Sequence, residues 1–184
     1  MAQSQAMVAD EVIAAYRFAR HAALLDVGGG HGVFVERIAR AAPGLRLAIF
    51  DLPGVVEGAR ARLDQHGLAE RVALHGGDFL RDSLPQGFDC ITLVRILHDH
   101  DDGPAQSLLR AIRAALPPGG RLVLAEPMAD TEGAAAMGHA YFGLYLWAMG
   151  SGRPRRSSEI GAMLRVAGFA RWRRVATAQP IVAS

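Results

Sequence analysis

Apolar and polar positions along the chain follow two alternating patterns. Short apolar runs, typical of buried strands, cover residues 22–28, 46–51, 71–76, 88–95 and 120–126. Elsewhere apolar residues recur every three to four positions, which predicts helices over 5–19, 33–42, 54–66, 104–116, 134–149 and 157–167. This alternation of strand and helix is typical of a mostly parallel sheet covered by helices on both faces, a doubly wound α/β fold.

The end of the chain predicts two further strands. Runs near 171–177 and 180–183 would close the sheet as an antiparallel hairpin, and Gly168 would cap the helix before them. We therefore expect a Rossmann-like, seven-stranded sheet, mostly parallel with a C-terminal antiparallel strand. A leading helix within residues 1–20 would precede it.

Length and composition suit one domain. The chain has 184 residues, 51% of them hydrophobic, which is enough for a sizeable core. Its one cysteine, Cys90, lies in an apolar run and predicts a buried thiol in a reducing compartment. No export signal opens the chain, and the uncharged stretch 134–149 is too short for a bilayer span. We expect a cytoplasmic protein with no transmembrane segment.

Charge gives little indication of nucleic-acid binding. The chain has 20 basic and 18 acidic residues, for a net charge of +2. Its C-terminal third holds seven arginines: Arg153, Arg155, Arg156, Arg165, Arg171, Arg173 and Arg174. No aromatic residues separate those at 153–156, and those at 171 and 173 alternate as on the wet face of a strand. We interpret the cluster as solvated surface and expect no nucleic-acid partner.

A glycine-rich turn follows the first predicted strand, with the sequence Asp26-Val27-Gly28-Gly29-Gly30-His31-Gly32. Alternate glycines let the backbone turn tightly and approach a ligand, and the following helix offers unpaired N–H groups. An adenine nucleoside or nucleotide is the expected ligand. A dinucleotide-binding turn would read G-x-G-x-x-G, but Val33 stands at the third glycine position.

A second acid follows the next predicted strand. Asp51 lies about twenty residues beyond the glycines, the distance expected of a carboxylate that accepts from ribose hydroxyls. Leu52-Pro53 comes next, so the strand ends where this carboxylate can project over the edge of the sheet. We place Asp51 and Leu52 in the cofactor site.

Several motifs together resemble a known family. The acid and alternate glycines of 26–32 resemble the D-x-G-x-G-x-G motif of class I S-adenosylmethionine-dependent methyltransferases. The segment 50–53 and the L-H-D-x-x-D pattern of 97–102 resemble the caffeate/acetylserotonin type of small-molecule O-methyltransferase. Segments 95–102 and 148–155 are most similar to bacterial hydroxyneurosporene (carotenoid) O-methyltransferases.

The resemblance implies S-adenosylmethionine as the cofactor. Asp26 would accept from the ammonium of its amino-acid tail, and Gly28 and Gly30 would border it. In the turn Gly76-Gly77-Asp78-Phe79, Asp78 would accept from the adenine amine while Phe79 packs against the ring. The family pattern also places Arg95 in the lining of the cofactor pocket.

The resemblance also implies methyl transfer to a hydroxyl, with His98 as the general base. A hydroxyl is a poor nucleophile until its proton is removed, and histidine ionises near neutral pH. A base histidine needs a partner on its other ring nitrogen, and Glu126, at the carboxyl end of a predicted strand, is the candidate. Asp99, the next residue of the motif, completes the catalytic set.

The chain departs from the family pattern at several points. Plant relatives supply a second acid in a G-x-E-R-T segment, and here that segment is Gly152-Arg153-Pro154-Arg155-Arg156. His100 replaces a tryptophan common in relatives. Family members carry a helical N-terminal domain that dimerises, and this chain begins at the helix before the core. We expect the catalytic domain over 1–184, with a homodimer in the full-length context.

The expected acceptor is an apolar hydroxylated small molecule, such as the carotenoid hydroxyneurosporene, with residues 137–149 as a roof over its site. A phenolic or polyketide-like acceptor is one alternative, and a cofactor-binding domain without catalysis is another. His98, His100 and Asp102 also have the H-x-H-x-D spacing of a di-metal hydrolase. Gly103 stands where the next histidine ligand would be, so we expect no metal site.

Overall fold

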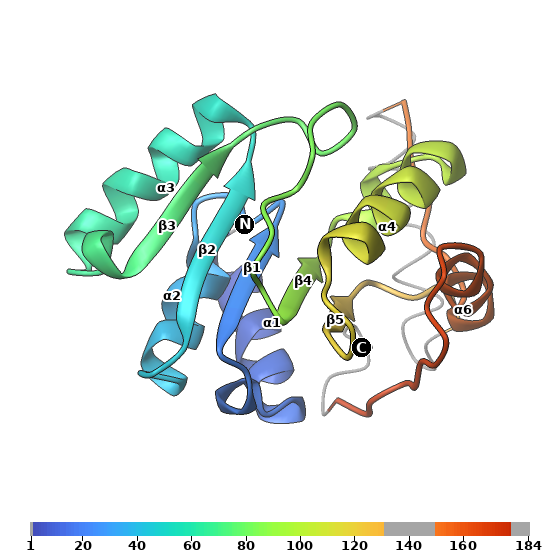
Figure 1. Cartoon of the computed structure of the whole chain (residues 1–184), viewed down its shortest axis with the longest axis horizontal. Helices are drawn as coiled ribbons and strands as arrows, with labels where there is room; N and C mark the ends of the chain where they lie inside the picture. The colour runs from blue at the N-terminus through green and yellow to red at the C-terminus, as the bar shows by residue number, and fades with distance from the viewer. Residues whose placement is uncertain (1, 131–149, 178–184) are drawn as a thin grey trace.

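The computed structural model of the chain describes residues 2–130 and 150–177. Its centre is a parallel sheet of β1 (Ala23–Val27), β2 (Arg46–Asp51), β3 (Val72–Gly76), β4 (Cys90–Val94) and β5 (Arg121–Ala125). The strands are ordered β3-β2-β1-β4-β5 (Figure 1). The predicted Rossmann-like α/β fold is therefore confirmed, with five strands in the described part of the chain.

Helices cover both faces of this sheet. One face packs against α1 (Ala2–Ala15), α2 (Val33–Ala41) and α3 (Pro53–Gln65), and the other against α4 (Asp102–Ala115) and α6 (Ser157–Val166). Neighbouring residues of β1 show why: Leu24 contributes to the first core and Leu25 to the second, and both are fully buried. Burial on both faces explains why the strands are continuous apolar runs rather than alternating ones.

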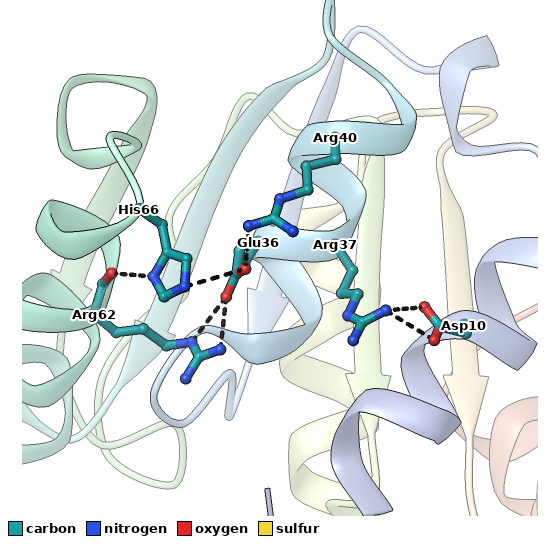
Figure 2. Close-up of polar contacts among 6 residues, drawn as sticks. All are labelled: Asp10, Glu36, Arg37, Arg40, Arg62 and His66. Carbon is teal, nitrogen blue, oxygen red and sulfur yellow. Dashed lines mark hydrogen bonds and ion pairs between the residues drawn. The ribbon is translucent and has the colours of Figure 1, made fainter. Parts of the chain in front are cut away.

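A buried carboxylate joins α2 to α3 (Figure 2). Glu36 of α2 is only 4% exposed. It accepts hydrogen bonds from Arg62 of α3 at 2.7 and 2.9 Å and from Arg40 at 2.7 Å, and His66 Nε2 lies 3.6 Å away. The amphipathic pattern of α2 predicts its buried face, but not this acid within it.

Polar contacts also fix α1 and the turn after it. Arg37 donates to both carboxylate oxygens of Asp10, at 2.7 and 2.8 Å, which ties α2 to α1 (Figure 2). The Tyr16 hydroxyl lies 2.8 Å from His21 Nε2, and His21 Nδ1 lies 2.9 Å from Asp89. The expected helix over 5–19 ends at residue 15, and a separate 3₁₀ turn, Phe18–Arg20, follows.

The expected strand over 171–177 is wrong. These residues have no regular secondary structure, and residues 171–174 are all exposed. The expected hairpin partner, 180–183, lies outside the described residues. The expected helix over 134–149 also lies outside them. None of the described helices is long and apolar enough to cross a bilayer.

The strand order defines where a ligand is expected. The chain passes from β1 to β2 on one side of the sheet and later reaches β4 on the other side of β1. In open α/β sheets, ligands bind outside the carboxyl ends of the strands at such a switch point. The glycine turn after β1 and a 3₁₀ turn, Leu97–Asp99, soon after β4 both lie at this end.

Candidate active site

The glycine turn closes around the ends of β1 and β2. Gly28 has a φ of 72°, and a Cβ there would collide with the Ile96 side chain, which follows β4. Asp51, at the end of β2, accepts hydrogen bonds from the backbone N–H of Gly30 at 2.8 Å and of Leu52 at 2.7 Å. Asp51 and Leu52 thus lie beside the glycine turn, and the Leu52 side chain is exposed.

Asp26 is a buried carboxylate beside the same turn. It is 2% exposed, and its Oδ1 accepts a 2.6 Å hydrogen bond from the Thr92 hydroxyl. Burial raises its pKa to about 7, although the Thr92 hydrogen bond opposes the rise. Within the described residues its Oδ2 accepts no hydrogen bond, and this atom lies 2.8 Å from where a Cβ on Gly29 would be. A buried, half-satisfied carboxylate against a glycine turn fits a cationic ligand group.

The turn after β3 approaches the turn after β4. Asp78 accepts from the Leu80 N–H at 2.9 Å, and its own N–H donates to Asp82 at 2.8 Å, so the loop is internally hydrogen-bonded. The Phe79 ring meets the His100 ring edge-on, with centroids 5.3 Å apart. The structure therefore brings the predicted adenine-binding turn to the segment that carries His98.

Arg95 follows β4 directly and has an unusual backbone. Its φ is 61°, which makes it the one non-glycine residue of the described chain in the left-handed region. Its N–H donates to the Ala125 carbonyl at 2.8 Å, and its side chain is half-buried. A non-glycine residue pays roughly 1 kcal/mol or more for this conformation, and such strain is concentrated at functional sites. Arg95 therefore lies at the switch point of the sheet, and its role in the cofactor pocket stays a prediction.

His98 and Glu126 form a buried pair. His98 is 3% exposed, Glu126 is 2% exposed, and Nδ1 of the histidine lies 2.7 Å from Oε2 of the glutamate. On its other nitrogen, Nε2, His98 faces Asp99 Oδ1 at 3.2 Å. The structure thus brings together the three residues that the sequence assigns to catalysis.

Glu126 also holds the backbone around His98, which the sequence does not predict. Its Oε1 accepts from the N–H groups of Ile96 and Leu97, each at 2.7 Å. Its Oε2 accepts from the His98 N–H at 3.3 Å as well as from the ring. We refer to residues 96–100 as the 96–100 turn. One carboxylate therefore satisfies three N–H groups at the start of this turn.

Arg155 corrects the interpretation of the C-terminal arginines as solvated surface. It is 2% exposed, and it donates to the carbonyl oxygens of Leu97 at 2.6 Å and His100 at 2.7 Å and to Asp102 Oδ1 at 2.9 Å. Arginine is almost never buried unless its guanidinium is fully paired, and here the 96–100 turn supplies the acceptors. In the sequence, Arg155 stands at the arginine position of the G-x-E-R-T segment, and this match could have singled it out from the other arginines.

His98, His100 and Asp102, which have the spacing of metal ligands, do not form a metal site in the described part of the chain. Among the described residues, no three histidine, cysteine or acidic side chains are placed to hold a metal ion. His98 pairs with Glu126, the His100 ring lies against Phe79, and Asp102 accepts from Arg155.

The fold is a doubly wound parallel sheet, and its switch point carries a glycine turn, a strand-end acid and a buried His–Glu pair. This arrangement is typical of α/β enzymes that use a nucleoside cofactor. Comparison with known families narrows this class. The O-methyltransferase domain matches residues 1–170, and the chain belongs to this family.

Individual proteins similar to this chain are also methyltransferases. Demethylspheroidene O-methyltransferase from Cereibacter sphaeroides is 41% identical over 184 residues, which are 100% of this chain and 48% of that protein. The solved structure "PigF with SAH" has a TM-score of 0.86 and 31% identity, covering 95% of this chain and 53% of its own. Human N-acetylserotonin methyltransferase in complex with SAM has a TM-score of 0.85 and 26% identity, covering 99% and 52%. The chain thus spans about half the length of the relatives it matches.

Proposed function

We propose that this chain carries the cofactor site and the base of an S-adenosylmethionine-dependent O-methyltransferase that acts on an apolar hydroxylated small molecule. The observation that carries the proposal is the buried pair of His98 and Glu126, 2.7 Å apart, beside the glycine turn at the switch point of the sheet. Family membership and the two related structures with SAH or SAM support the cofactor.

The residues around the turn suit the parts of this cofactor, which when bound supplies an electrophilic methyl group. The buried Asp26 carboxylate accepts from the ammonium of the amino-acid tail, beside Gly28 and Gly30. Asp51 accepts from the ribose hydroxyls on the lone pairs that its two backbone bonds leave over. Leu52 also belongs to the cofactor site. The remaining contacts come from Asp78 at the adenine amine, Phe79 at the adenine ring and Arg95 at the pocket wall.

We assign the role of the base to Nε2 of His98. An ionised carboxylate can only accept a hydrogen bond, and the contact of Nδ1 with Glu126, at 2.7 Å, is shorter than the 3.2 Å between Nε2 and Asp99 Oδ1. We therefore assign the proton to Nδ1 and the lone pair to Nε2. Nε2 takes the hydroxyl proton as the acceptor oxygen bonds to the methyl carbon and the carbon–sulfur bond breaks. Asp99, 3.2 Å from Nε2, stabilises the imidazolium that forms. In plant relatives a second acid stands at the position that Pro154 occupies here. In this chain Asp99 supplies a second carboxylate beside His98 instead.

For the acceptor we propose a carotenoid alcohol such as hydroxyneurosporene. The support is the 41% identity to demethylspheroidene O-methyltransferase. A phenolic acceptor is the second candidate, favoured by the 36% identity over 166 residues to acetylserotonin O-methyltransferase from Mus musculus, since acetylserotonin carries its hydroxyl on an aromatic ring. A tertiary alcohol is far less acidic than a phenol, so a carotenoid demands more of His98. We further propose a cytoplasmic enzyme that is a homodimer in its full length.

The test is transfer, by the protein at full length, of labelled methyl from S-adenosylmethionine to hydroxyneurosporene and, separately, to a phenol. We expect His98→Ala to lower the rate at least about 100-fold, as loss of a general base implies, and Glu126→Gln to lower it less. Affinity for S-adenosylhomocysteine should stay within about twofold in both variants, because neither residue is assigned to the cofactor.

Two results would contradict this proposal. Equal rates in wild type and His98→Ala would remove His98 as the base. Cofactor binding without transfer to either acceptor would favour the cofactor-binding domain without catalysis.

A further inference from the structure

We propose that Arg155 is a positioning residue for the base: its guanidinium fixes the 96–100 turn and thereby holds the His98 ring against Glu126. This inference rests on the proposed role of His98. It concerns a residue that does not lie in the cofactor site and does not contact the ring it positions.

The 96–100 turn is held from both of its ends. Glu126 accepts from the N–H groups of residues 96, 97 and 98 at its start. Arg155 donates to the carbonyl oxygens of Leu97 and His100 at its end. The turn has two backbone hydrogen bonds of its own, from the Asp99 N–H to the Ile96 carbonyl at 3.2 Å and from the His100 N–H to the Leu97 carbonyl at 3.3 Å. They leave the N–H groups of residues 96–98 to be satisfied by a side chain. A carboxylate at the N–H end and a cation at the carbonyl end also complement the dipole of the turn.

The segment that carries Arg155 packs directly on the same backbone. Gly152 has a φ of 87°, and a Cβ there would overlap the His98 carbonyl oxygen and lie 2.7 Å from the Asp99 carbonyl carbon. The Gly152 N–H donates to Asp101 at 2.9 Å, and the Ser151 hydroxyl donates to the Asp99 carbonyl at 3.3 Å. The position of the His98 backbone is therefore set from residues 151–155.

Only arginine fits this place. All three guanidinium nitrogens of Arg155 are used, on two carbonyl oxygens and on Asp102 Oδ1, and the side chain is 1% exposed. The guanidinium hydrogen bonds of Arg155 and Arg153 hold the pKa of Asp102 below its ordinary value, so the counter-charge stays ionised. Lysine has a single nitrogen on a flexible stem and cannot serve two carbonyls and a carboxylate in this fork geometry.

The test follows the His98 ring by NMR in the chain labelled with ¹⁵N-histidine, and it needs neither acceptor nor cofactor. The chain has seven histidines, and a His98→Asn variant identifies the signal of interest. The readouts are the tautomer and the exchange rate of the Nδ1 proton with solvent, measured in wild type, Arg155→Lys and Arg155→Met. Arg156→Met is the matched control, because this neighbouring arginine is exposed.

We expect Arg155→Lys to speed Nδ1 proton exchange about tenfold, the factor implied by loss of one hydrogen bond to a charged group, and Arg155→Met to speed it further. The increase should exceed any rise in the population of globally unfolded protein, measured by urea unfolding of the same variants. Arg156→Met should change neither quantity.

An exchange rate that rises only in proportion to global unfolding would overturn the proposal and leave Arg155 a purely structural residue. If Arg155→Met does not fold, the Lys variant alone decides between the two results. A wild-type chain that fails to bind S-adenosylhomocysteine would count against the proposed function, but it would leave this comparison intact.

Discussion

At the scale of single residues, the site contains groups that reduce the stability of the fold. Asp26 is buried with one hydrogen bond from Thr92, and burial raises its pKa from 3.8 to about 7. A buried residue with no functional constraint would be apolar or fully paired. The strained backbone of Arg95, with its φ of 61°, is a second such cost at the same end of the sheet.

Asp26 makes the stability of the chain depend on pH. Between pH 4 and 7 the folded chain binds a proton at Asp26 that the unfolded chain has lost, so the free energy of unfolding falls as pH rises through this range. The full shift corresponds to about 4 kcal/mol. We expect Asp26→Asn to be more stable than wild type at pH 8, with the difference disappearing towards pH 4, in urea unfolding measured at several pH values.

The control for this experiment is Asp64→Asn, which removes an exposed carboxylate from α3. It should leave the pH dependence unchanged. A parallel loss of stability with pH in wild type and Asp26→Asn would show that Asp26 is ionised in both states and would refute the assigned shift.

Residue types in strand-end motifs were predictable from the sequence, because each has a chemical reason to stand there. Asp26, Asp51, His98 and Glu126 all lie at the carboxyl ends of β1, β2, β4 and β5 or just after them, as expected. Arg155 was not predictable from its local pattern. Its burial depends on acceptors more than fifty residues away in the chain, and a run of arginines gives no sign of them.

At the scale of elements, the spacing of apolar residues predicted the strands and helices of the sheet region. It did not predict their exact ends, which depend on tertiary contacts. The expected helix over 33–42 is α2, which ends at residue 41, and the expected strand over 88–95 is β4, which covers 90–94. The segment 171–177 is the exception. It alternates like a strand, but alternation predicts only which side chains share a face, not whether a neighbouring strand is present.

The contacts of α2 allow a matched comparison between a buried and an exposed ion pair. Glu36 is buried and accepts from Arg62 and Arg40, whereas Asp10 is exposed and accepts from Arg37 (Figure 2). We expect Glu36→Ala to lower the free energy of unfolding by about 1–2 kcal/mol, discounted because both arginines are partly solvated. Asp10→Ala should lower it by about 0.5 kcal/mol or less.

Urea unfolding of both variants checks this prediction. Because the Glu36 carboxylate contacts Arg40, Arg62 and His66, none of which is assigned to the cofactor, its loss should also leave affinity for S-adenosylhomocysteine within about twofold. Equal destabilisation by the two substitutions would mean that burial adds nothing to the Glu36 contacts.

At the scale of the whole molecule, the residues proposed for cofactor binding and for catalysis lie at one end of a single parallel sheet. Comparison with relatives shows that this chain corresponds to about half of their length. The proposed acceptor and dimer therefore concern the protein at full length, whereas cofactor binding can be measured on this chain directly. Cofactor binding is thus the claim on which every later step depends.

The most direct measurement is calorimetric titration of the chain with S-adenosylhomocysteine, with NAD as the control ligand and Asp51→Asn as the control variant. The account predicts micromolar binding of S-adenosylhomocysteine and none of NAD. Asp51→Asn should weaken binding by about 1–3 kcal/mol, because a ribose contact is lost. Tighter binding of NAD than of S-adenosylhomocysteine, or no effect of Asp51→Asn, would contradict the assignment of the glycine turn.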